Sequence, residues 1–152
     1  MLKRPVCFLG LGFGSGLAPF APGTFGTIAA IPIYMLMELL PLTIYLLVTT
    51  IFFILGIYIC QKSADWLGKD DPSAVVWDEI AGYLVTMIAA PSGWAWMLLG
   101  FVLFRFFDII KPWPISWFDK NLHGGLGIMV DDVVAGMFAA FCLQLIVVAN
   151  IL

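Results

Sequence analysis

Long apolar stretches separated by short polar segments dominate the chain. Runs without any charged residue extend over residues 5–37, 39–61, 80–104 and 133–152. Each is long enough to cross the hydrocarbon core of a bilayer, which is about 30 Å thick. Within the first run, residues 10–26 hold six glycines together with Pro19 and Pro22, too many helix breakers for a regular span. We expect a loop or re-entrant segment there.

Turn signals divide the rest of the chain into helices. The first is expected from Gly23 or Thr24, with the threonine as cap, to about Leu40, with Pro32 inside it. The others are predicted over residues 42–60, 78–90, 94–108 and 131–150. Residues 61–77 read as a polar surface connection, and residues 111–130 as a loop with a short interfacial helix.

The break at Pro91-Ser92-Gly93 decides the topology. Residues 80–110 as one helix would be about 46 Å long, well beyond the bilayer core. A hairpin broken there also places every basic residue on one side, which the positive-inside rule identifies as cytoplasmic. A straight span over residues 80–104 is the alternative, and it would split the basic residues between the two sides. These residues are Lys3, Arg4, Lys62, Lys69, Arg105, Lys111 and Lys120.

Composition agrees with an integral membrane protein. Of the 152 residues, 62% are apolar and 11% charged, and the mean hydropathy is +1.06. The fold class predicted is all-α, a polytopic membrane helical bundle forming one domain over residues 1–152 in contact with membrane lipid. The three cysteines lack metal-type spacing, and no basic stripe suggests a nucleic-acid partner.

The hairpin brings acidic residues to one membrane boundary. Carboxylates at the same depth repel one another unless cations neutralise them, and clusters of oxygen ligands suit Mg²⁺. Helix capping is the structural alternative for the two adjacent pairs, because each is expected to open a helix. The predicted metal ligands are Asp78, Glu79, Asp108, Asp131 and Asp132.

Asp108 differs from the other acids because it lies at the end of its predicted helix, where the dipole disfavours an anion. A salt bridge to Arg105 or Lys111 is its structural alternative. With Lys111 and Asp131, Asp108 is a candidate catalytic residue, and Arg105 and Lys111 are candidates for binding phosphate. Interfacial snorkelling is the alternative for the two cations.

Three further residues are weaker candidates. The glycine-rich segment around Ser15 could turn backbone N–H groups toward a phosphate, although close helix packing by small residues fits it equally well. Thr24 is a second candidate for contacting the substrate. His123, the only histidine, either protonates a leaving group or holds its loop, and we favour the second role.

Several phosphatase chemistries lack their residues in this chain. There is no cysteine followed six positions later by arginine, no Asp-x-Asp pair and no Ser/His/Asp arrangement. This leaves water activated on a metal ion, or an aspartate nucleophile.

Four ordered motifs carry a family resemblance. GFGSGLAPFAPGTFGT (12–27), WDEIAGYLVTM (77–87), RFFDIIKPWPI (105–115) and HGGLGIMVDDVVAG (123–136) resemble phosphatidylglycerophosphatase A over roughly residues 11–140. The resemblance implies a bacterial inner-membrane enzyme that removes the terminal phosphate of phosphatidylglycerophosphate with Mg²⁺, giving phosphatidylglycerol. It places the family's polar motif residues on the five acids and Lys111.

The hypothesis is therefore a magnesium-dependent lipid phosphatase whose active site faces the cytoplasm. A phosphotransferase that hands the group to an alcohol is the nearest rival, and the sequence does not distinguish the two. A divalent-cation channel or carrier is the rival from another class, because acids within membranes mark ion pathways. A purely structural membrane subunit is the third.

Overall fold

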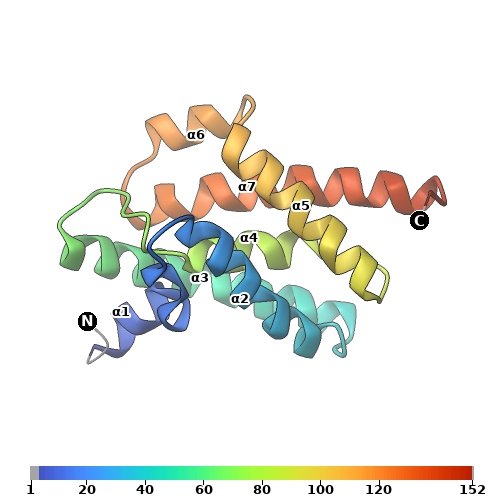
Figure 1. Ribbon diagram of the computed structural model, residues 1–152, viewed down its shortest axis with the longest axis horizontal. Coiled ribbons are helices and arrows are strands. Elements are labelled where there is room, and N and C mark those ends of the chain that lie inside the picture. Colours follow the sequence, from blue (N-terminus) through green and yellow to red (C-terminus); the bar gives the residue numbers. More distant parts are fainter. Residues whose placement is uncertain (1–3, 152) are drawn as a thin grey trace.

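The computed structural model describes residues 4–151, which are helical with no strand (Figure 1). Lys3, one of the basic residues counted above, lies outside the described residues. The helices are α1 (Pro5–Gly10), α2 (Pro22–Met37), α3 (Leu42–Leu67), α4 (Trp77–Thr86), α5 (Trp94–Ile110), α6 (Ile115–Asn121) and α7 (Gly124–Val148), with a distorted 3₁₀ segment, η1 (Gly12–Leu17), after α1.

The helix that contains Pro32 starts and ends at residues other than those predicted. α2 begins at Pro22, with Ala21 in the left-handed conformation before it, so Thr24 is not the cap. It ends at Met37 rather than Leu40, and Pro32 is inside it as predicted. In the glycine-rich segment Phe13 and Gly14 have positive φ angles, which interrupts η1.

α3 is longer than predicted. The expectation of a polar connection from residue 61 was wrong, because α3 continues to Leu67 and ends only where Gly68 adopts a left-handed conformation. Gln61 Nε2 donates a hydrogen bond to Asp65 Oδ1 at 2.7 Å along this last part. Residues 61–67 are therefore the end of a helix that buries Ser63 and Ala64 and exposes Lys62 and Asp65.

The break predicted within the apolar stretch of residues 80–110 is present. α4 ends at Thr86 and α5 begins at Trp94, so a continuous span over residues 80–104 is wrong. The first arm is shorter than the predicted 78–90, and the second extends two residues beyond Asp108.

α7 begins seven residues earlier than predicted. Its first residue is Gly124, so Asp131 and Asp132 lie within the helix and the capping interpretation of this pair was wrong. Glycine at position 125 is needed for packing, because a Cβ there would collide with the Ile57 carbonyl of α3. The glycines at the start of α7, which were predicted to form a loop, instead let the first turn of this helix approach α3.

α4 lies at the centre of the molecule, packed against α2, α3 and α7. At its crossing with α7, a Cβ on Gly82 would lie 2.9 Å from the Asp132 carbonyl oxygen, and a Cβ on Gly136 would collide with the Gly82 carbonyl. Asp78 and Asp132 each lie one turn before these glycines. Small residues at the crossing therefore let the backbones approach and bring two acids from different helices together.

Two helices of the described chain, α3 and α7, are long and apolar enough to cross a membrane. α3 exposes Leu47, Ile51 and Ile54 along its length. α7 is more covered, because α3, α4, α5 and α6 all pack on it (Figure 1).

Candidate functional site

A cleft of about 240 Å³ gathers the predicted site residues at one end of the helices. Its walls come from the beginnings of α2 and α4, the end of α5, the 68–76 connection and the second turn of α7. It is lined by all five predicted acids and both predicted cations, together with Ala21, Pro22, Gly23, Asp71, Ser73 and Val75.

Three of the acids are close enough to share one cation. Glu79 of α4, Asp108 of α5 and Asp132 of α7 each offer an oxygen, and these atoms all lie within 4.8 Å of one another. Asp108 and Asp132 are buried, and Glu79 is partly exposed. Each acid comes from a different helix, so only the packed bundle creates the group.

Several oxygen atoms of the cleft lack protein partners. Four buried carboxylate oxygens accept no hydrogen bond: Asp78 Oδ1, Glu79 Oε2, Asp131 Oδ1 and Asp132 Oδ2. Buried carboxylates without partners are costly, and a bound cation would satisfy them. An all-oxygen donor set fits Mg²⁺ rather than zinc.

Arg105 is held among the acids on one side of the cleft. Its Nη1 bonds to Asp108 Oδ2, three residues along α5, and lies 3.7 Å from Glu79 Oε1. The salt bridge considered as the alternative for Asp108 therefore forms with Arg105, but within the cleft and beside a second acid. Arg105 is 15% exposed at its side chain, which leaves it reachable from the cleft.

Lys111 is the second cation that lines the cleft. It follows α5 with φ 47°, a left-handed conformation that ends the helix. Its Nζ donates to Asp131 Oδ2 at 2.6 Å and to Asp119 Oδ1 at 2.8 Å. Burial disfavours the charged ammonium, but these two hydrogen bonds outweigh it and raise the pKa of Lys111 above its ordinary value.

The start of α2 closes the cleft at close range. A Cβ on Gly26 would lie 2.7 Å from Glu79 Oε2, and one on Gly23 would lie 3.1 Å from Arg105 Nη1. Only residues without a side chain allow the α2 backbone to come this close to the acids. The glycine-rich motif therefore contributes to the site through Gly23 and Gly26.

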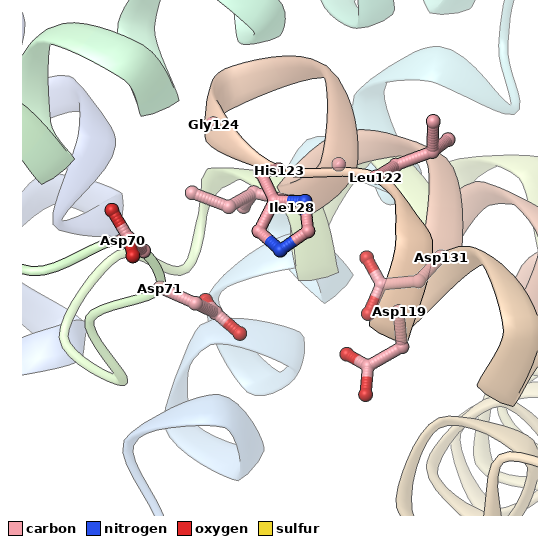
Figure 2. A pocket seen from close by; sticks show the side chains of 9 residues that line it. Asp70, Asp71, Asp119, Leu122, His123, Gly124, Ile128 and Asp131 are labelled. Atoms are coloured by element: carbon pink, nitrogen blue, oxygen red, sulfur yellow. The ribbon is translucent and has the colours of Figure 1, made fainter.

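The remaining sequence candidates lie elsewhere. Neither Ser15 nor Thr24 is among the described residues that line the cleft, and the Ser15 hydroxyl donates to the Gly12 carbonyl at 2.8 Å. His123 is the residue before α7 and lies over an adjoining hollow of about 60 Å³ (Figure 2). Asp71 and Asp131 line both spaces.

Three residues near the site were not predicted from the sequence. Asp71 and Ser73 belong to a connection that read as a solvated surface segment, and Asp119 belongs to α6. Figure 2 shows Asp71 facing Asp119 and Asp131 across the hollow. Nothing in the local sequence distinguishes these residues, because the path of the connection and the docking of α6 bring them to the acids.

The fold and the cleft together define a class: an all-helical, highly apolar protein whose polar chemistry is concentrated in one cleft lined by carboxylates and two cations. Comparison with known proteins makes the class specific. Residues 8–147 match the family model described as phosphatidylglycerophosphatase A. The chain belongs to the phosphatidylglycerophosphatase A family, as the four motifs predicted.

Individual relatives agree with this assignment. The chain is 47% identical over 146 residues to phosphatidylglycerophosphatase A of Escherichia coli strain K12, covering 95% of this chain and 85% of that protein. It is 46% identical over 140 residues to the Haemophilus influenzae phosphatidylglycerophosphatase A, covering 91% and 86%. A Bacteroides thetaiotaomicron protein, provisionally described as a phosphatidylinositol-3-phosphatase, is 41% identical over 149 residues, covering 91% and 92%.

The relatives are all described as phosphatases, which supports a phosphoric ester hydrolase as the enzyme class of this chain. No solved structure matches the chain.

Proposed function

We propose that this protein removes the terminal phosphate of phosphatidylglycerophosphate, releasing phosphatidylglycerol and inorganic phosphate, and that the reaction depends on Mg²⁺. Family membership supports the substrate, because two relatives are phosphatidylglycerophosphatases A. The observation that carries the chemistry is the meeting of Glu79, Asp108 and Asp132 within 4.8 Å beside two cationic side chains.

The acids of the cleft divide into two groups in this proposal. Glu79, Asp108 and Asp132 hold the cation, and Asp78 extends this set with its unpartnered oxygen. Asp131 belongs to the cation set through its free Oδ1, while its Oδ2 accepts the hydrogen bond from Lys111. When bound, Mg²⁺ supplies charge neutralisation at the phosphate and lowers the pKa of a water molecule.

Arg105 and Lys111 bind the phosphate oxygens. Each bonds to a carboxylate that lines the cleft, so both are already positioned beside the space that a phosphate would fill. In the reaction, the oxygen of a water molecule forms a bond to phosphorus while the bond from phosphorus to the glycerol oxygen breaks, and one proton of that water passes to the glycerol oxygen. Positive side chains stabilise the charge that develops on the phosphoryl oxygens.

The membrane arrangement is part of the proposal. Two helices of the described chain can cross the bilayer, and Arg105 and Lys111 line the cleft. With the positive-inside rule this supports a multi-pass protein of the bacterial cytoplasmic membrane whose cleft opens at the cytoplasmic boundary. The substrate then reaches the cleft without leaving the bilayer.

The test is inorganic phosphate release from phosphatidylglycerophosphate by the purified full chain in detergent, with and without Mg²⁺. Asp108→Ala and Asp131→Ala should abolish magnesium-dependent release, and Asp65→Ala, which removes an exposed carboxylate of α3, should not. Phosphatidylinositol 3-phosphate serves as the competing substrate, because one relative is described as acting on it.

Failure of folded wild-type protein to release phosphate from phosphatidylglycerophosphate would refute the proposal. Divalent-cation flux through proteoliposomes would then be the next measurement, since the same acids suit a cation pathway. Equal release from both lipids would refute the assigned headgroup while leaving the phosphatase chemistry in place.

A further inference from the structure

α5 carries one stripe of side chains that changes from charged to apolar. Asp108, Arg105, Phe101, Leu98 and Trp94 follow one another at intervals of three or four residues, so they lie on one face of the helix. The first two belong to the carboxylate cleft. The last three line an open apolar groove of about 400 Å³.

The second wall of this groove is α2, which also borders the cleft. Ile28 and Ile31 line the groove opposite α5, and Pro22 and Gly23 line the cleft at the beginning of the same helix. α2 and α5 run side by side (Figure 1). The same two helices therefore border both spaces, the cleft where α2 begins and α5 ends, and the groove farther along both helices.

The spacing along the helices suits an amphipathic ligand. At 1.5 Å per residue, Phe101 lies about 6 Å along α5 from Arg105, and Trp94 about 16 Å. Ile28 lies about 7.5 Å along α2 from Gly23. In phosphatidylglycerophosphate, a glycerol, a phosphodiester and a second glycerol lie between the terminal phosphate and the acyl chains. With the terminal phosphate in the cleft, the acyl chains would therefore begin within the groove, between about 6 and 16 Å along α5 from Arg105.

We propose that the groove between α2 and α5 binds an acyl chain of the phospholipid substrate and so aligns its headgroup phosphate with the carboxylate cleft. The inference rests on the proposed lipid phosphatase function and adds the site that recognises the tail. A second apolar hollow, on the other side of the ridge formed by Trp94 and Leu98, adjoins the groove and is lined also by Val102.

Binding in this groove acts by positioning. Lipid tails surround the protein in a bilayer and are as apolar as the groove, so burial by itself gives no preference for the substrate. A chain fixed between two helices instead limits the orientations of the attached headgroup. Misplacement of a reacting group by about 1 Å lowers a rate by about a hundredfold, so even partial loss of alignment is measurable.

The kinetic test compares the diacyl substrate with its headgroup alone, glycerophosphoglycerophosphate. Leu98→Trp fills the groove, and Leu47→Trp is the matched control, because these leucines are 54% and 59% exposed and Leu47 lies on α3, outside the groove. Leu98→Trp should lower kcat/KM for the diacyl lipid about tenfold and leave the headgroup rate unchanged. Leu47→Trp should change neither rate.

A second readout does not depend on turnover. Phosphatidylglycerophosphate carrying a photoactivatable diazirine on one acyl chain should label α2 near Ile28 and α5 near Leu98, and excess unlabelled phosphatidylglycerophosphate should compete this labelling where phosphatidylcholine does not. Ile28→Trp should reduce it, and Ile51→Trp, equally exposed on α3 at 46%, should not.

Two outcomes would overturn the inference and leave the phosphatase activity in place. In the first, Leu98→Trp changes kcat/KM for both substrates equally or for neither. In the second, phosphatidylcholine competes for the labelling as well as phosphatidylglycerophosphate does, which would show that the groove holds only surrounding lipid. Absence of phosphate release by the wild type would instead refute the proposed function. In that case, competition by unlabelled phosphatidylglycerophosphate for the labelling would still test whether the groove binds this lipid.

Discussion

Gly23 offers a way to disturb the cleft without removing any polar group. A methyl group at this position, introduced by Gly23→Ala, would lie 3.0 Å from Glu79 Cδ, closer still to Glu79 Oε1, and 3.1 Å from Arg105 Nη1. Ordinary contacts of such a carbon begin at 3.4 Å. The Glu79 carboxylate must therefore move by several tenths of an ångström, and its nearer oxygen by more.

The effects on stability and activity should separate. Crowding costs about 1 to 3 kcal/mol, and alanine gains about 1 kcal/mol over glycine within a helix, so the net loss of stability is about 0 to 2 kcal/mol. Displacing one carboxylate of the three-acid group should lower kcat by about a hundredfold. Phosphate release and thermal unfolding in detergent measure the two quantities.

The control is Gly100→Ala, where the new methyl group would collide with the Met87 sulfur of the apolar core, away from the cleft. It should reduce stability similarly and keep phosphatase activity. If Gly23→Ala remains folded and retains activity within about twofold of the wild type, the claim that the close approach of α2 sets the geometry of the acids is wrong.

Three further predictions address other contacts. Lys111→Gln removes the ammonium bound to Asp131 and should lower kcat by about a hundredfold or more, measured at saturating Mg²⁺; undiminished kcat would exclude Lys111 from phosphate binding. Asp132→Asn should raise the Mg²⁺ concentration needed for half-maximal activity at least about tenfold, and the rise in melting temperature that we expect Mg²⁺ to give the wild type should be smaller in this variant. An unchanged Mg²⁺ response would remove Asp132 from the metal site. Tyr45→Phe loses the hydrogen bond of 2.5 Å to the Leu84 carbonyl and should cost about 1 kcal/mol in unfolding free energy at unchanged kcat, and an unchanged unfolding free energy would count against that bond.

Helix boundaries were predicted best where a single residue type decides the backbone. The break at Pro91-Ser92-Gly93 and the proline within α2 were both located correctly, because proline and glycine act locally. The C-terminal end of α3 and the start of α7 were not. Residues 61–67 and Gly124, Gly125 and Gly127 are helical because of what they pack against, and hydropathy carries no information about that contact.

The residues that make up the acidic cluster were predicted from the sequence, and their arrangement in space was not. The broken hairpin predicts that five carboxylates, Arg105 and Lys111 reach one membrane boundary, and all of them line one cleft. The hairpin does not predict that Glu79, Asp108 and Asp132 are the three acids that lie within 4.8 Å of one another, or that Lys111 bonds to Asp119 and Asp131. Those pairings depend on distances of a few ångströms between different helices.

Hydropathy, helix breakers and motifs along the chain were enough to predict the apolar helices, the broken hairpin, the family and the identities of the acids and cations. The closing of the cleft by α2 at Gly23 and Gly26, and the crossing of α4 and α7 at Gly82 and Gly136, could be seen only in the packed molecule. Backbone approach at a glycine depends on the partner helix, so the depth and shape of the cleft arise only when the helices pack.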